Sequence, residues 1–167
     1  MKWGDYMKNR FFDVNNNIYS NSLHIVLLLK YYKESESIDN MIIKLYLIKY
    51  PKILIDICRK YNIHVNYNLF SDFQYNNTQS QMLKYSLKLN VDGFYDALTY
   101  LYIKNLINYD IKNNLIIKTK KLDEIKLNEV PKSLILLVEI IDKLFNHYNV
   151  NEIRKSIRKN ERSYYGK

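Results

Sequence analysis

Apolar residues recur along the chain mostly with helical spacing, and this pattern predicts a mainly helical protein. The first predicted helix covers residues 18–33, and its unbroken apolar run at 25–29 is typical of a central, buried helix. A polar break follows. The side-chain oxygen of Ser37 or Asp39 can then cap a second, nearly all-apolar helix over 40–49 by accepting hydrogen bonds from its free N–H groups.

Pro51 separates this second helix from a third. Proline disfavours helix at the residue before it and fits the first turn of a following helix. Over residues 52–61 the apolar side chains share one face, so we expect an amphipathic helix with the single cysteine, Cys58, in the core. The apolar set is Ile53, Leu54, Ile57, Cys58 and Tyr61, and the outer set is Lys52, Asp56, Arg59 and Lys60.

The middle of the chain changes character. Residues 62–80 are polar and rich in asparagine, which indicates a long connection with a short strand at 64–67. Helix resumes over 81–89, and a further helix begins at Asn90 or Asp92.

That further helix ends near residue 105, and a β-hairpin follows it. Residues 106–111 and 115–119 read as strands, joined through Asn113 and Asn114, which can both adopt the positive φ of a two-residue turn. The order of helix, short loop and hairpin is that of the second half of a winged helix, and the apolar residues Leu98, Leu101, Leu106 and Ile107 resemble that superfamily.

The last part of the chain holds one more strongly amphipathic helix after Pro131, with Leu134, Leu137, Val138, Ile141, Leu144 and Tyr148 on one stripe. We therefore predict a mainly α single domain with a small β-hairpin, in which a helical N-terminal part packs on a winged-helix-like module. Its parts are an aromatic arm at 1–14, the helical part at 18–61, the winged-helix-like part at 81–148 and a basic tail at 151–167.

Composition narrows the class of protein. A chain of 167 residues with 47% hydrophobic residues can bury its own core. One cysteine allows no internal disulfide and suits a reducing cytoplasm. The N-terminal residues lack the apolar region of a signal peptide, and no apolar run approaches the ~20 residues needed to span a membrane. We expect a cytoplasmic protein without membrane contact.

Catalytic motifs are missing. With only three glycines, the chain has no phosphate-cradling loop. The histidines His24, His64 and His147 lie far apart and lack neighbours at metal-ligand spacing. The carboxylate pairs Asp92 with Asp96 and Asp123 with Glu124 are more typical of helix ends than of acid–base chemistry. We expect no enzyme activity, no cofactor and no metal; a third hypothesis, a small enzyme with Cys58 as nucleophile, is disfavoured by the position of Cys58 on an apolar face.

The helix before the hairpin does not look like a DNA-reading helix. Base reading in the major groove needs Arg, Lys, Asn or Gln, whereas this helix exposes tyrosine, threonine and aspartate. Exposed aromatic residues commonly anchor protein interfaces, and the N-terminal arm has the same character. The predicted protein interface is Trp3, Phe11, Phe12, Tyr95, Asp96, Thr99 and Tyr100, and the alternative is that these aromatic residues complete the domain's own core.

A formal charge of +9 indicates an acidic partner such as nucleic acid. The preference for Lys over Arg and the single alanine, Ala97, also fit the codon bias of an AT-rich genome, which weakens that inference. The residues suited to non-specific phosphate contact, or else forming a solvated rim, are Lys118, Lys120, Lys121, Arg154, Lys155, Arg158, Lys159 and Arg162.

The apolar helical run from Ile42 to Lys52, together with the downstream helix and hairpin and the basic tail, resembles one family. This family is the middle component of bacterial three-component ABC (SMC-like) ATPase systems, which includes the accessory subunit of Lamassu-type anti-phage defence. The resemblance implies an adaptor without chemistry of its own, which bridges an SMC-like ATPase to an effector subunit, often a nuclease. The alternative is a free-standing winged-helix DNA-binding regulator of a phage or plasmid.

Overall fold

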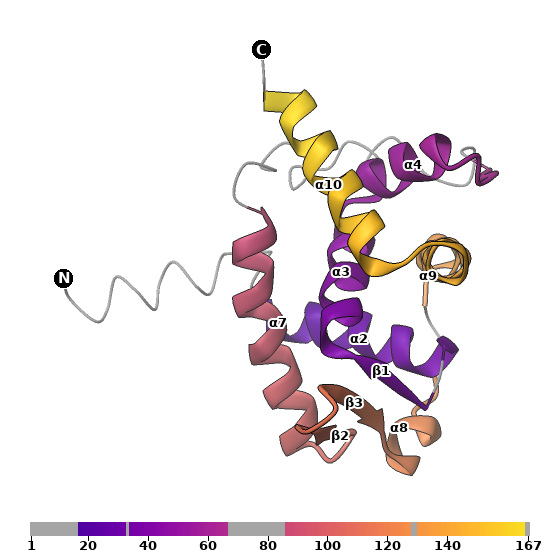
Figure 1. The fold of residues 1–167 in the computed structure, drawn as a ribbon. Coiled ribbons are helices and arrows are strands. Elements are labelled where there is room, and N and C mark those ends of the chain that lie inside the picture. Colours follow the sequence, from indigo (N-terminus) through magenta and orange to yellow (C-terminus); the bar gives the residue numbers. More distant parts are fainter. Residues whose placement is uncertain (1–16, 33, 67–85, 128–129, 166–167) are drawn as a thin grey trace.

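The computed structural model describes residues 17–32, 34–66, 86–127 and 130–165, and it is mainly α with a small antiparallel sheet, as predicted (Figure 1). The helices and strands are α2 (Ile18–Tyr32), β1 (Ser35–Ser37), α3 (Ile38–Lys49), α4 (Pro51–Lys60), α7 (Ser86–Ile103), β2 (Ile107–Asp110), β3 (Leu115–Lys118), α8 (Lys120–Glu124), α9 (Lys132–His147) and α10 (Val150–Tyr165). Within these ranges, no helix is long and apolar enough to cross a membrane.

Helix α3 lies at the centre, and α2, α4, α7, α9 and α10 all pack against it (Figure 1). Every residue from Met41 to Lys49 is buried. The helix begins as its sequence predicts, because the Ser37 hydroxyl accepts a hydrogen bond of 3.1 Å from the Asn40 amide. Pro51 then occupies the first turn of α4, and Cys58 is buried in the core, which confirms both predictions.

The segment predicted to be a basic tail forms helix α10, and it packs on α3 and α4. Ile153 and Ile157 are 0% exposed and belong to the same apolar cluster as the central helices. Residues one turn apart on a helix share a face, so these two isoleucines bring the same side of α10 against the core.

The three described strands form one sheet in the order β1-β3-β2. Strand β1, which the sequence suggested only as a break between helices, pairs antiparallel with β3, with Ser35 opposite Ile117 and Ser37 opposite Leu115. A three-residue polar strand has no periodicity of its own, so its sequence could not indicate it. The succession α2, β1, α3 and then α7, β2, β3, with this sheet order, resembles the order of elements in a winged helix, with α4 between α3 and α7.

The turn of the hairpin differs from the predicted two-residue turn. Asp110 pairs with Leu115, so four residues connect the strands. Asn114 has a positive φ of 55°, but Asn113 does not. Instead, the Asp110 carboxylate accepts hydrogen bonds from the Asn113 amide at 3.2 Å and from its side chain at 2.7 Å, which closes the turn through side-chain chemistry.

Helix α7 runs without interruption through Asn90 and Asp92, so the predicted start of a separate helix there is wrong. Its buried side is Phe94, Ala97, Leu98 and Leu101, and the Gly93 carbonyl accepts a hydrogen bond from the Asn21 side chain at 3.0 Å. These tertiary contacts outweigh local capping preference. Residues 64–66 form no strand, and Asn62, with φ of 56°, ends α4 in the left-handed conformation that asparagine tolerates.

A buried ion pair joins the sheet to the central helix. The Lys44 ammonium on α3 contacts the Glu36 carboxylate on β1, and their side chains are only 5% and 12% exposed. Burial alone would raise the pKa of Glu36, but hydrogen bonds and charge from Lys44, with hydrogen bonds from Asn40 and Ser37, lower it. The Lys44 ammonium also lies 4.8 Å from the centre of the Phe145 ring on α9.

Breaking this pair on one side should be costly. Replacing Lys44→Met or Glu36→Gln alone is expected to lower the free energy of unfolding by about 3 kcal/mol, because a buried charge loses its partner. The double variant Lys44→Met/Glu36→Gln leaves no unpaired buried charge. Its free energy of unfolding should therefore exceed that of whichever single variant is less stable, as measured by urea denaturation followed by circular dichroism. Additive losses in the double variant would show that the two charges act independently.

His24 on α2 gives the fold a pH dependence. Burial, with a smaller effect from the charge of Lys49, lowers the pKa of its imidazole from 6.5 to about 4, so the folded protein holds it neutral. Between these pH values the unfolded chain binds the proton more strongly, and stability must fall as pH decreases. From pH 7.5 to 5 we expect a loss of about 2 kcal/mol in the free energy of unfolding. His24→Gln should remove this loss, and an unchanged slope in that variant would contradict the assignment.

Candidate protein-interaction surface

The outer side of α7 presents the residues that the sequence marked as a protein interface. Tyr95, Thr99 and Tyr102 follow one another at helical spacing on this side, and Tyr95 and Tyr102 are each 49% exposed. Asp92 is exposed beside them, and Asp96 is half-buried. The Thr99 hydroxyl donates to the Tyr95 carbonyl at 2.9 Å, so it is already engaged within the helix.

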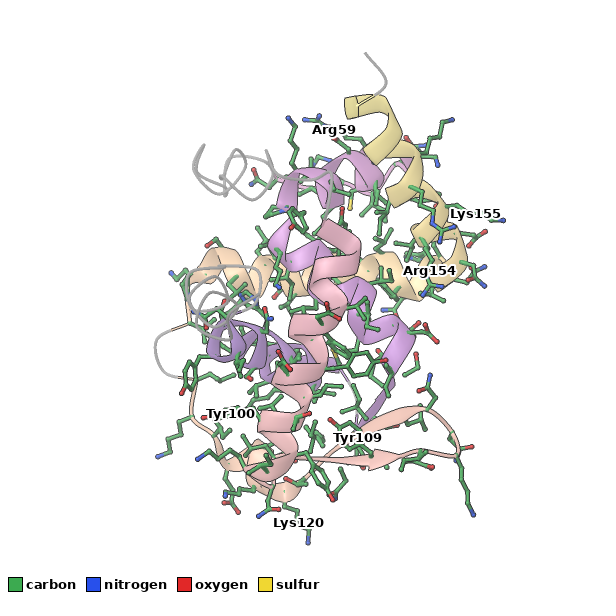
Figure 2. The ribbon with its side chains drawn as sticks, turned by 90° about the vertical axis from the view of Figure 1, so that its left-hand side faces the viewer. Arg59, Tyr100, Tyr109, Lys120, Arg154 and Lys155 are labelled. Carbon is green, nitrogen blue, oxygen red and sulfur yellow. The ribbon has the colours of Figure 1, made fainter. Side chains whose placement is uncertain are left out.

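Neighbouring elements extend this surface on both sides of the helix. Tyr109 on β2 lies beside Tyr102, with ring centres 5.3 Å apart, and Tyr19 on α2 meets Tyr100 edge-to-face at 5.5 Å. Figure 2 shows Tyr100 and Tyr109 at opposite edges of α7. We call this set the tyrosine face: Tyr19, Tyr95, Tyr100, Tyr102 and Tyr109.

Three of its members were absent from the sequence-based interface. Tyr102 lies seven residues after Tyr95, and this helical spacing could have found it. Tyr19 and Tyr109 belong to other elements, and only the tertiary fold brings them beside the tyrosines of α7. Tyr100 differs from Tyr95, because it also packs against the hydrophobic core. The alternative that these aromatic residues complete the domain's own core therefore applies in part to Tyr100.

The tyrosine face is aromatic and without positive charge at its centre. Burial, with smaller effects from Tyr102 and Tyr95, raises the pKa of Tyr109 to about 12. The Lys104 ammonium lies at one edge, 5.6 Å from the centre of the Tyr100 ring. Ile103, exposed at the end of α7, and Ile111, 90% exposed at the hairpin tip, add apolar area at this end of the molecule.

The predicted N-terminal part of the interface, Trp3, Phe11 and Phe12, lies outside the described residues. The predicted phosphate-binding set does not form one surface. Lys120 lies at the sheet end of the molecule, whereas Arg154 and Lys155 lie on α10, well separated from it (Figure 2).

Several of these basic groups have structural roles. Lys118 forms an ion pair of 2.9 Å with Asp123, and Lys121 donates to the Lys104 carbonyl at 3.0 Å. Arg154 pairs with Asp39 at 3.1 Å. The exposed remainder is Lys120, Lys155, Arg158 and Lys159, and the side chain of Arg162 lies outside the described part of the chain.

Cys58 is unsuited to nucleophilic chemistry. Its side chain is fully buried, and burial raises the pKa of its thiol to about 12, so it is protonated at neutral pH. Among the described residues, no group of His, Cys, Asp or Glu has the geometry to hold a metal ion.

An open pocket of about 480 Å³ lies between the ends of α4 and α9. The rings of Tyr61 and Tyr148 stack in its wall, with their centres 3.9 Å apart. Its lining contains neither a carboxylate nor a thiol, and consists of Tyr61, Asn62, Ile63, Lys143, His147 and Tyr148.

Comparisons of the chain with protein-family models, with curated proteins and with solved structures gave no match. The resemblance to the accessory subunit of SMC-like ATPase systems therefore stays a prediction.

Proposed function

We propose that this chain is a non-catalytic adaptor that binds another protein subunit through the tyrosine face. The observation that carries the proposal is the exposure of Tyr95 and Tyr102, each 49%, on the helix that precedes the wing. Tyrosine rings bury a large area at low entropic cost, and their hydroxyl groups can still donate hydrogen bonds. An exposed set of such residues on one side of a rigid helix is typical of a protein interface.

The position of this face argues against the alternative of a DNA-binding regulator. In a winged helix, the helix before the wing enters the major groove and offers basic or amide side chains to the bases. Here Asp92 and Asp96 lie on the outer side of that helix, where their charges would repel phosphate. The tyrosine face is therefore better suited to protein than to DNA.

The chemistry of the face also suggests the character of its partner. Half-buried rings fit an apolar groove, and the flanking aspartates favour lysine or arginine at its rim. The family resemblance supports an SMC-like ATPase, an effector subunit or both as the proteins bound, in an anti-phage or anti-plasmid defence complex. In such a complex this chain would position the effector without taking part in its chemistry.

Co-expression of the tagged chain with the products of its flanking genes tests the proposal. The double variant Tyr95→Ala/Tyr102→Ala should weaken binding of a larger subunit about 1,000-fold, since buried aromatic anchors are worth about 2 kcal/mol each. Isothermal titration with the purified subunit gives the affinity.

The matched control is Tyr31→Ala, because Tyr31 on α2 is equally exposed, at 49%, but does not belong to the tyrosine face. This variant should bind normally. Normal binding by the double variant, accompanied by a lowered melting temperature, would mean that Tyr95 and Tyr102 serve packing and would contradict the proposal.

A further inference from the structure

Helix α10 carries a basic surface that is separate from the tyrosine face. Lys155, Arg158 and Lys159 are exposed, and Arg158 and Lys159 lie three and four residues after Lys155, so all three share the outer side of the helix. The opposite side is held in the core by Ile153 and Ile157, which are fully buried. We call these three cationic residues the α10 basic face.

Contacts on both flanks fix the rotation of α10 and therefore the direction of this face. On one flank the Ser156 hydroxyl accepts from the Lys60 ammonium at 2.8 Å and lies 2.9 Å from the Tyr61 hydroxyl. On the other flank Arg154 forms its ion pair with Asp39. Between these flanks Lys155 points toward solvent (Figure 2), and Arg158 and Lys159 are exposed as well.

Within the described part of the chain, no ion pair involves Lys155, Arg158 or Lys159. Glu152, one turn before Lys155, accepts a hydrogen bond of 3.0 Å from the Asn149 amide and so caps the start of α10. The side chain of the other carboxylate of this helix, Glu161, lies outside the described part of the chain.

We propose that the α10 basic face binds the sugar–phosphate backbone of a nucleic acid without sequence specificity. Lys155 lies about 5–6 Å along the helix from Arg158 and Lys159, and these two neighbours point about 100° apart around it. Phosphates that recur about every 3.4 Å along an aligned strand can therefore reach all three cations. This inference goes beyond the proposed function, because it assigns a second class of partner to a different surface. It also places the contact on α10 and not on the residues near the wing, Lys118 and Lys121, which are held by structural contacts.

Other occupants fit this surface less well. A membrane-binding helix inserts apolar side chains into the lipid, but the isoleucines of α10 face the core. A protein interface usually centres on an aromatic or apolar anchor, and residues 150–160 expose none beside the three cations. A surface that offers charge alone matches a regular polyanion.

Fluorescence anisotropy with a labelled duplex of random sequence tests the proposal. The full chain should bind the duplex, and the logarithm of its affinity should fall with the logarithm of salt concentration with a slope of about −3, one unit for each phosphate contacted. The triple variant Lys155→Gln/Arg158→Gln/Lys159→Gln should weaken binding at least about 10-fold at low salt and flatten the slope. If the triple variant does not fold, the same measurement is made with the double variant Lys155→Gln/Lys159→Gln.

The control is Lys112→Gln/Lys120→Gln/Lys126→Gln, which removes three exposed lysines from other elements and lowers the net charge equally. It should retain most of the affinity. Equal losses in both variants, or no binding by the original chain, would overturn the proposal. Competition by polyglutamate as effective as that by unlabelled DNA would also overturn it, because the surface would then accept any acidic polymer.

Discussion

The burial of α3 on every side is the constraint on which the rest of the structure depends. Nine consecutive residues of this helix are buried, and two of them, Lys44 and Lys49, carry charge. A buried ammonium needs an opposite charge or hydrogen bonds, and Glu36 on β1 supplies both to Lys44. The pair therefore ties the sheet to the central helix. Helices α7 and α10 pack against α3, so each has one side in the core and one side left for solvent.

The surfaces left free by this packing differ in chemistry. The outer side of α7 is aromatic and weakly acidic, whereas the outer side of α10 is basic. Aromatic side chains gain most from an interface that excludes water, and lysine and arginine gain most from a partner with regular negative charge. An adaptor that joins a protein assembly to the nucleic acid held by that assembly needs both kinds of surface. In the proposed adaptor, their separation on different helices would allow both partners to bind at once.

Local signals in the sequence predicted much of this fold. The cap at Ser37, the proline at position 51 and the apolar spacing of α9 each depend on neighbouring residues only, and all three are present in the structure. Features that depend on distant contacts were missed. Strand β1 exists because β3 offers it a pairing edge, and α7 continues through Asp92 because Asn21 and the core hold it. The tyrosine face was predicted for the α7 residues Tyr95 and Tyr100, but Tyr19 and Tyr109 reach it only through the tertiary fold.

The central claim is that the outer side of α7 meets a protein. Site-specific photo-crosslinking tests it most directly, with p-benzoylphenylalanine introduced at the position of Tyr102 and, for comparison, at that of Tyr31, in cells that express the flanking genes. Our account predicts a covalent adduct with one larger protein subunit from the position of Tyr102 and none from that of Tyr31. An adduct with DNA from the position of Tyr102, or equal adducts from both positions, would contradict it.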